Sequence, residues 1–568
     1  MRRLLGAARD KPAMLGGLAV LLVATVGLLL ARHNPRVPFT ERVAVQMVLR
    51  DPGSANALGS LRWDRAAIGA VDASLERVAF FEGPQIVFQA AVQSDGRVTQ
   101  SFDFVGRAAP YGSPLAYEPA VLVGLSVLCL LAAGVAPLRR RRNLDALALL
   151  SFVAPVVLLQ LRFVDWSVLA ALPGLIYLLV RCLRVGIGPP QPVQPSTSLY
   201  LALTRNWEPG ARLRVLRMAI GALAFVVIAV GVSSTGAVDV IYGVMEGGTK
   251  LLHGLLPYGH LPGDVVHGDT YPLLSYALYA PIAALSPVSS TWDSVDVALG
   301  ATALSALLTA VVLIAAVTRG PTLTRAETVS PTETTAPHTG RGSECAGLLA
   351  ALTWLSFPPL LITVSTGTTD VVLASILVIA LVLWRRPGAS SALLACAGWF
   401  KLAPFALFPI WMAPLRGRRL AASVIALISV SAVMLAVLIG LGGTDGVSAM
   451  LHAIGFQFRR GSFQSPWSAL GLASFQPIGQ AAVLALIAGV AIRLRRAPEL
   501  FAERERVAAI SAAILLSLQL TADYWSFLYL VWIVPLVGLS LLATPEAARA
   551  PVAVRERRAH QVAAGPAW

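Results

Sequence analysis

The sequence has few charged residues, and this shortage excludes a soluble globular protein. Asp, Glu, Lys and Arg make up 13% of the 568 residues, whereas soluble domains carry about 25%. Hydrophobic residues make up 56% of the chain. Many apolar stretches reach the roughly 18–20 residues that are needed to cross a bilayer. These features predict a polytopic membrane protein.

Cysteine is also scarce. The four cysteines, Cys129, Cys182, Cys345 and Cys396, lie in or beside apolar segments, and no Cys-x-x-Cys spacing occurs. Nothing in this pattern indicates a disulfide framework or a zinc site. We interpret the cysteines as small apolar residues that fill space between helices.

The chain is basic, with a net charge of +15, yet we expect no nucleic-acid partner. The arginines cluster in loops between hydrophobic stretches, as in Arg139 to Arg142. This is the positive-inside pattern of membrane proteins, and it accounts for the basicity without a polyanionic partner. The sequence therefore predicts a multi-pass protein of the cell membrane, whose first partner is the lipid bilayer.

Changes in composition divide the chain into six segments. They are a signal anchor (residues 1–31), an extracytoplasmic α+β domain (32–119), accessory transmembrane helices (120–184), a Pro-rich cytoplasmic linker (185–216), a transmembrane core (217–543) and a cytoplasmic tail (544–568). A cleaved signal peptide is the alternative for the first segment, but its apolar run is longer than a usual signal core. The predicted fold is all-α and polytopic, with about twelve spanning helices, a half-helix pair and one small α+β domain.

The predicted α+β domain has a short helix and a hairpin. We expect a helix over residues 40–49 and strands over residues 77–81, 85–92 and 98–104. Ser94-Asp95-Gly96-Arg97 between the last two strands is a hairpin signal. Apart from His33 the segment contains no His or Cys, which argues against a metal or thiol role.

Two apolar segments of the core do not fit simple spans. Residues 391–412 contain Lys401 and Pro404 at their middle and have arginines on both sides. Both ends are then cytoplasmic, which predicts a pair of half-helices. Residues 273–288 are broken by two prolines, and we expect them to lie at the outer interface or to form a re-entrant segment.

Acidic residues mark one end of the predicted helices. At outer helix ends or in outer loops the sequence places Asp165, Asp239, Asp370, Asp445 and Asp523. Only Lys401 is near an apolar interior, and we expect its side chain to extend to the cytoplasmic face. Transporters usually hold ionisable residues near the bilayer midplane. The distribution therefore favours chemistry at the outer membrane–water interface.

The stretch 238–273 is the predicted site. Asp239 follows the apolar segment 218–232, where the chain leaves the membrane, and a polar loop follows it. Transfer of a sugar from a polyprenyl phosphate suits this place, because the donor brings its own phosphate leaving group. Asp239 is the predicted base, since an alcohol is a poor nucleophile at neutral pH. Arg459 and Arg460, in the second outer loop, are the predicted ligands of the phosphate.

The other predicted substrate contacts have simpler alternatives. The predicted contacts are His260, Asp264, Asp269, Tyr271 and Asp370. Asp264 and Asp269 follow glycines and are also typical turn formers, and His260 and His267 are also ordinary polar loop residues. Asp370 is also placed to cap a helix that starts at Val371.

Six further residues have simpler structural interpretations. Arg459 and Arg460 are also typical interface anchors, and Asp239 itself is also an ordinary charge at a helix end. Trp525, Trp532 and Tyr524 are typical of an interfacial aromatic belt.

Several motifs, in this order, resemble the GT-C superfamily of membrane glycosyltransferases. The closest resemblance is to the actinobacterial, polyprenyl-phosphate-mannose-dependent type, glycosyltransferase family 87-like. The motifs are Asp239 after a helix, Gly254, Pro257-Tyr258, Tyr271-Pro272-Leu273, Gly367-Thr368-Thr369-Asp370, Lys401-Leu402-Ala403-Pro404 and residues 517–535. Leu273 departs from the family's usual second proline. The likeness covers roughly residues 217–542.

The resemblance implies an inverting hexosyltransferase, with mannose as the first candidate sugar. It implies that the aspartate of the first outer loop is the base, which corresponds to Asp239. The donor would be a polyprenyl-phosphate sugar, the acceptor a glycolipid or glycan, and the active site extracytoplasmic. Metal dependence varies within the superfamily, and the sequence shows no convincing set of metal ligands and no cofactor motif.

Two other classes of protein remain as alternatives. A transporter or flippase of lipid-linked saccharides would need a charged path through the helices. A non-catalytic membrane scaffold would tolerate the change Asp239→Asn with its function intact.

Overall fold

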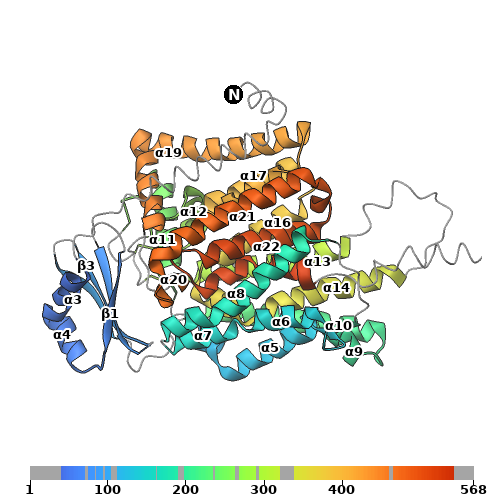
Figure 1. The fold of residues 1–568 in the computed structure, drawn as a ribbon, viewed down its shortest axis with the longest axis horizontal. Coiled ribbons are helices and arrows are strands. Elements are labelled where there is room, and N and C mark those ends of the chain that lie inside the picture. Colours follow the sequence, from blue (N-terminus) through green and yellow to red (C-terminus); the bar gives the residue numbers. More distant parts are fainter. Residues whose placement is uncertain are drawn as a thin grey trace, which may run out of the picture.

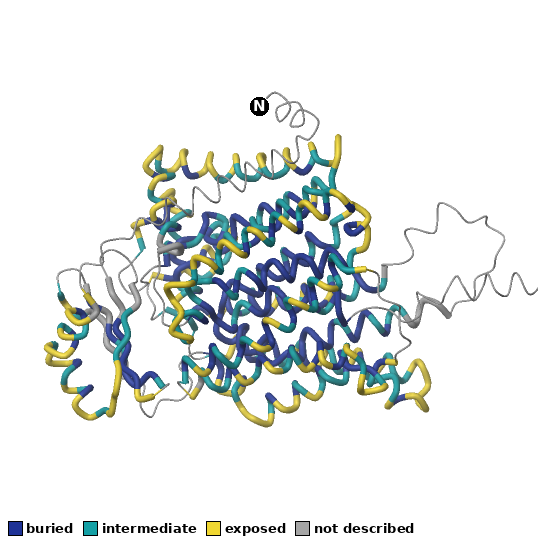
Figure 2. The backbone as a smooth tube through the Cα atoms, viewed as in Figure 1, coloured by how far each residue is buried: buried dark blue, intermediate teal, exposed yellow. Residues whose placement is uncertain are grey.

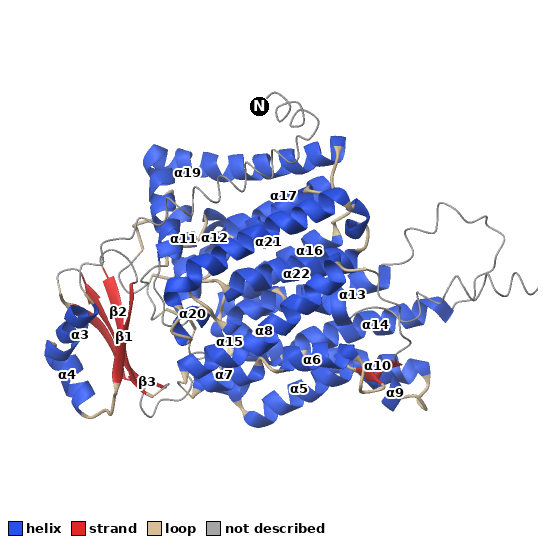
Figure 3. Ribbon diagram, in the orientation of Figure 1, coloured by secondary structure: helices blue, strands red, loops and turns tan. Residues whose placement is uncertain are grey.

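The computed structural model is mostly helical, with a small sheet at one side of a helical bundle (Figure 1, Figure 3). It describes residues 40–70, 75–83, 85–93, 96–103, 112–161, 163–189, 197–234, 237–261, 268–289, 293–319, 338–459 and 465–542. The predicted signal anchor and the cytoplasmic tail lie outside the described residues.

The bundle combines long helices with many short ones. The helices of 15 residues or more are α5 (Pro119–Ala133), α8 (Val164–Ile187), α10 (Pro209–Val232), α13 (Asp296–Arg319), α14 (His338–Leu355), α19 (Gly417–Arg459), α21 (Gln476–Arg496) and α22 (Arg504–Leu520). The shorter helices are α6 (Arg141–Leu150), α7 (Val153–Gln160), α9 (Leu199–Leu203), α11 (Asp239–Leu252), α12 (Leu273–Leu285), α15 (Pro358–Thr366), α16 (Asp370–Val382), α17 (Pro387–Phe400), α18 (Phe408–Met412), α20 (Pro466–Ala469) and α23 (Val534–Val537).

Single tight turns and one small ribbon complete the bundle. The 3₁₀ turns are η1 (Pro114–Tyr117), η3 (Ala403–Leu407), η4 (Ala473–Phe475), η5 (Pro498–Phe501) and η6 (Phe527–Trp532), and η7 (Gly538–Leu542) is a π-helical turn. The strands β5 (Val135–Ala136) and β6 (Thr197–Ser198) pair antiparallel.

Six helices among the described residues are long and apolar enough to cross a membrane, or seven if the pair α14 and α15, bent by 56°, is one span. Several crossings predicted from the sequence correspond to helices of 13 to 17 residues, such as α5, α16 and α22. At about 1.5 Å per residue these helices fall short of a 30 Å hydrocarbon core. The chain is a helical membrane protein, and the figure of about twelve spans stays a prediction.

Helix α19 supports membrane embedding most directly. It lies along one edge of the bundle, and only 6% of its most apolar window is buried within the protein. Figure 2 shows this helix largely exposed, while the centre of the bundle is buried. A helix of this length with apolar side chains on all faces is stable only where lipid covers it.

The half-helix pair is confirmed. Helix α17 ends at Phe400, Lys401 is extended (φ −145°, ψ 138°), and η3 and α18 follow. The hydroxyl of Ser423, near the start of α19, donates to the carbonyl of Pro387 at 3.5 Å. Arg416 donates to the carbonyl of Ala413 at 3.2 Å. Both ends of the pair therefore lie at the start of α19.

A four-stranded antiparallel sheet with two helices forms the small domain. The strands pair in the order β1 (Arg65–Ala70), β2 (Leu75–Glu82), β3 (Gln85–Gln93) and β4 (Val98–Asp103). Helices α3 (Glu41–Arg50) and α4 (Pro52–Gly59) pack on one face of the sheet. The predicted helix and three strands are confirmed. Strand β1 was not predicted, because Arg-Ala-Ala-Ile-Gly-Ala holds one strong strand former.

The other face of the sheet is fixed to the helical bundle. Phe81 of β2 shares a buried cluster with Val164 at the start of α8. The guanidinium of Arg65 lies 3.7 Å above the centre of the Phe81 ring and forms an ion pair with Asp165 of α8. The small domain is therefore held at the end of the bundle where α8 begins.

Candidate functional site

Asp239 begins helix α11 and keeps an exposed carboxylate. Val238 before it is extended (φ −78°, ψ 159°), so the helix starts at the aspartate. A carboxylate in the first turn is favoured by the partial positive charge of the helix N-terminus. Within the described residues, its one hydrogen bond comes from the N–H of Val240 at 2.9 Å. The carboxylate is therefore accessible to a substrate hydroxyl, whose proton it can accept.

The start of α11 is joined to the turn between α15 and α16. The N–H of Val238 donates to the carbonyl of Thr366 at 2.9 Å. Gly367 then ends α15 in the left-handed region (φ 73°, ψ 39°). A Cβ at this glycine would lie 2.6 Å from Leu299 Cδ2 and 3.4 Å from Ile241 Cβ. The structure therefore brings the predicted first outer loop and the predicted outer turn together.

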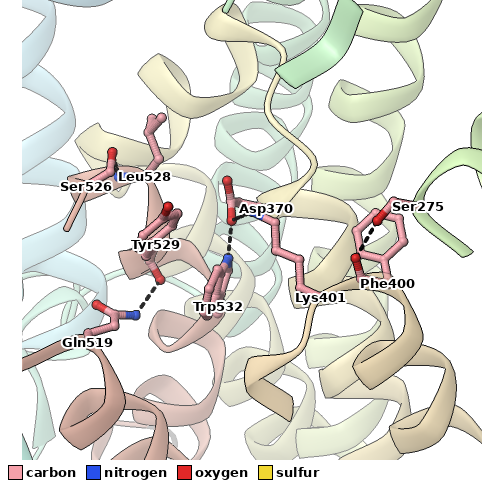
Figure 4. A network of polar contacts seen from close by, with 9 residues as sticks. All are labelled: Ser275, Asp370, Phe400, Lys401, Gln519, Ser526, Leu528, Tyr529 and Trp532. Atoms are coloured by element: carbon pink, nitrogen blue, oxygen red, sulfur yellow. Dashed lines mark hydrogen bonds and ion pairs between the residues drawn. The ribbon is translucent and has the colours of Figure 1, made fainter. Parts of the chain in front are cut away.

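Asp370, which ends this turn, is buried in an ion pair with Lys401. The Nζ of Lys401 lies 2.6 Å from Oδ1 of Asp370, and their side chains are 11% and 3% exposed. The indole N–H of Trp532 donates to the same oxygen. Figure 4 shows the three side chains converging from α16, the end of α17 and η6.

Aromatic rings complete the surroundings of Lys401. Its ammonium lies 5.9 Å from the ring centre of Tyr271, 5.3 Å from that of Tyr529 and 5.2 Å from that of Trp532. Rings within about 6 Å attract a cation through their quadrupole. The carboxylate and the rings together compensate the charge of a lysine that has little access to solvent.

Two predictions about these residues are wrong. Lys401 does not extend to the cytoplasmic face, because the break after Phe400 places its ammonium beside Asp370. Trp532 does not belong to an exposed belt, because it is 6% exposed and bonded to that carboxylate. Asp370 is the first residue of α16, and its Oδ1 faces Lys401 instead of capping the helix.

Polar contacts join the two described parts of the loop that follows α11, residues 253–261 and 268–272. The hydroxyl of Tyr258 donates to the carbonyl of Tyr271 at 3.1 Å, and the N–H of Gly259 donates to Oδ2 of Asp269 at 3.1 Å. Burial, and then the negative charge of Asp269, raise the pKa of the Tyr258 hydroxyl, so that it stays protonated as a donor. Asp269 thus stabilises the loop, in agreement with its alternative interpretation as a turn former.

The remaining predicted site residues are less informative. His260 is exposed, and Asp264 and His267 lie outside the described residues. Arg459 ends α19, whose backbone bends at Gly443 (φ 60°, ψ −152°), and its side chain is not described. Arg460 lies outside the described residues. The role of these arginines as phosphate ligands stays a prediction.

A glycine-rich face of α11 determines how closely this helix meets α12 and the loop. A Cβ at Gly243 would lie 2.8 Å from Gly268 Cα, and one at Gly247 would lie 2.1 Å from Tyr276 Cδ1. Tyr276 is fully buried, and its hydroxyl donates to the carbonyl of Gly268 at 2.8 Å. The glycines therefore fix the position of α11, and with it the position of Asp239.

The change Gly247→Ala should destabilise the protein by about 1–3 kcal/mol, because the added methyl group overpacks the Tyr276 ring. The matched change Gly221→Ala, in exposed α10 with no atom within 4 Å of the new Cβ, should stabilise it by up to about 1 kcal/mol. Thermal unfolding of the purified proteins in detergent, followed by tryptophan fluorescence, measures both. Equal unfolding midpoints would contradict the close packing of α11 on α12.

No described group of three or more His, Cys, Asp or Glu side chains lies close enough to hold a metal ion. Comparison with known proteins adds no relative: no protein-family model, curated protein or solved structure matches this chain. The function is therefore proposed from the residues and their arrangement.

Proposed function

We propose that this chain is a membrane glycosyltransferase that moves a hexose, with mannose as the first candidate, from a polyprenyl phosphate to a glycolipid or glycan acceptor. The observation that supports this best is the exposed carboxylate of Asp239 beside the turn Thr366 to Asp370. The order of the sequence motifs, which resembles that of polyprenyl-phosphate-dependent transferases, agrees with it. The proposed active site lies on the extracytoplasmic side.

The proposed reaction needs one base and one stabilised leaving group. The acceptor hydroxyl oxygen bonds to the anomeric carbon of the hexose, and its proton passes to the carboxylate of Asp239. The bond from that carbon to the phosphate oxygen breaks, and the phosphate keeps the electron pair. Inversion at the anomeric carbon follows from attack opposite the leaving phosphate. A base matters here because a neutral alcohol attacks slowly.

One observation favours the second candidate, a transporter or flippase of lipid-linked saccharides. Asp370 is the first residue of α16, and Lys401 directly follows the last residue of α17. The two helices pack together and are joined through Arg385 and Arg386. A helix rises by about 1.5 Å per residue, so the Asp370–Lys401 ion pair lies about 20 Å along the helices from the turn at these arginines. This distance is less than the roughly 30 Å thickness of the hydrocarbon core of a bilayer. Buried ionisable pairs at such depth often mark substrate pathways. The accessible carboxylate of Asp239 favours the transferase.

The proposal is tested with membranes that contain the chain and a panel of radiolabelled polyprenyl-phosphate hexoses. We expect label to leave one donor, polyprenyl-phosphate mannose first, and to appear in a glycolipid or glycan fraction. Membranes with an empty vector are the control. Label that stays on every donor while the protein is present in good amount would contradict the transferase.

A further inference from the structure

The turn that precedes α5 contacts the candidate site. Residues 112–117, which contain η1, follow the sheet and lead into α5; we call them the connector. Gly112 has φ +87°, a conformation that residues with a side chain rarely adopt. Ser113 is 5% and Ala116 is 0% exposed. Gly112, Ser113 and Ala116 are therefore buried in the bundle, while Pro114 and Leu115 of the connector are exposed.

Gly112 packs directly on the last residues of α15. A Cβ at this position would lie 2.5 Å from the hydroxyl oxygen of Ser365 and 3.1 Å from Cγ2 of Thr366. Ser365 has little freedom to move, because it is 0% exposed and its hydroxyl donates to the carbonyl of Ile362 at 2.9 Å. A side chain at position 112 would collide with the side chains of Ser365 and Thr366 and so press on the end of α15.

The end of α15 in turn holds the residue before Asp239. The carbonyl of Thr366 accepts the 2.9 Å hydrogen bond from the N–H of Val238. A displacement of Thr366 therefore moves the start of α11, which carries the carboxylate. Gly112, Thr366 and Val238 form an unbroken series of contacts from the connector to Asp239.

We propose that Gly112 and Thr366 are positioning residues, and that the connector belongs to the functional unit by setting the position of Asp239. The connector is held against α15, and the sheet is held separately against α8 by Arg65 and Phe81. The kinetic consequence rests on the proposed transferase function; the structural coupling does not.

Two alanine variants separate this coupling from ordinary backbone strain. Gly112→Ala strains a positive φ and also displaces Ser365. Gly83→Ala, in the turn between β2 and β3, strains a positive φ of +58°, but its new Cβ meets no atom within 4 Å. We expect Gly112→Ala to lower kcat for hexose transfer at least tenfold with the donor KM within twofold, and Gly83→Ala to change neither. The double variant Gly112→Ala, Ser365→Ala should recover most of kcat, because the colliding hydroxyl is gone.

A second readout does not depend on activity. In a Cys396→Ser background, where Cys129, Cys182 and Cys345 are buried, Asp239→Cys supplies an accessible thiol for a water-soluble maleimide. We expect Gly112→Ala to change its labelling rate at least threefold, and Gly83→Ala to leave it unchanged. Equal labelling rates in the two variants would overturn the coupling. If labelling shifts but wild type transfers no hexose, the coupling stands and the proposed function fails.

Discussion

Replacing Asp239 by asparagine should lower kcat for hexose transfer by about 10²- to 10⁴-fold, the usual contribution of a general base. Asparagine has nearly the same shape and keeps an oxygen that can accept the N–H of Val240, but it does not take up a proton at neutral pH. The donor KM should change little, because the base acts on the acceptor hydroxyl in the transition state. Initial rates at varied donor concentration, with purified protein in detergent, measure both constants.

Asp296→Asn is the matched control for this experiment. Asp296 is also an exposed aspartate in the first turn of a helix, α13. Together with Asp293 it contributes, after burial, to raising the pKa of Tyr242 on α11, so it lies close to the same region. We expect Asp296→Asn to retain at least half of the wild-type kcat. If the two variants lose the same activity, Asp239 acts only as a local charge.

Replacing Lys401 by methionine should destabilise the fold by about 3–5 kcal/mol. Methionine keeps much of the length of the side chain, but the change leaves the buried carboxylate of Asp370 without its cation, and an unpaired buried charge is costly. The double variant Lys401→Met, Asp370→Asn should recover most of the loss. Asparagine removes the charge and keeps an oxygen for the indole N–H of Trp532.

An exposed ion pair provides the contrast for Lys401. The side chains of Arg65 and Asp165 are 42% and 22% exposed, and solvent screens such pairs to about 0–1 kcal/mol. Arg65→Met should therefore lower the unfolding midpoint far less than Lys401→Met. The measurement is thermal unfolding in detergent under identical conditions. A Lys401→Met protein as stable as Arg65→Met would show that the buried pair contributes little.

Much of the architecture could be predicted because it depends on local pattern. Alternation and the Ser94 to Arg97 turn signal gave the β2–β4 strands of the small domain, and Pro404 with a lysine in an apolar run marked the broken helix. Strand β1 was missed because Ala and Gly have weak local preference for strands, and pairing with β2 is what extends this segment. The number of spans stays a prediction, because hydropathy alone does not show where a helix ends and several apolar helices are short.

The site was predicted only where its residues are close in sequence. Asp370 and Lys401 were assigned to different faces of the membrane, although they stand symmetrically in the sequence: Asp370 is fifteen residues before Arg385, and Lys401 is fifteen residues after Arg386. In a helical hairpin that turns at these arginines, Asp370 and Lys401 lie at the same distance from the turn. Their equal spacing in the sequence was therefore a signal that the two side chains meet. The contact of Gly112 with Ser365 had no such signal, because the two residues are far apart in the sequence and neither belongs to a predicted motif.

The central claim is that the chain transfers the hexose instead of moving the lipid-linked sugar across the bilayer. Proteoliposomes with purified protein, radiolabelled polyprenyl-phosphate mannose and a glycolipid acceptor test it most directly. We predict that labelled mannose appears on the acceptor in amounts equal to the polyprenyl phosphate released, and that Asp239→Asn stops both. Intact labelled donor that crosses the bilayer with no labelled acceptor would contradict the transferase and establish the transporter.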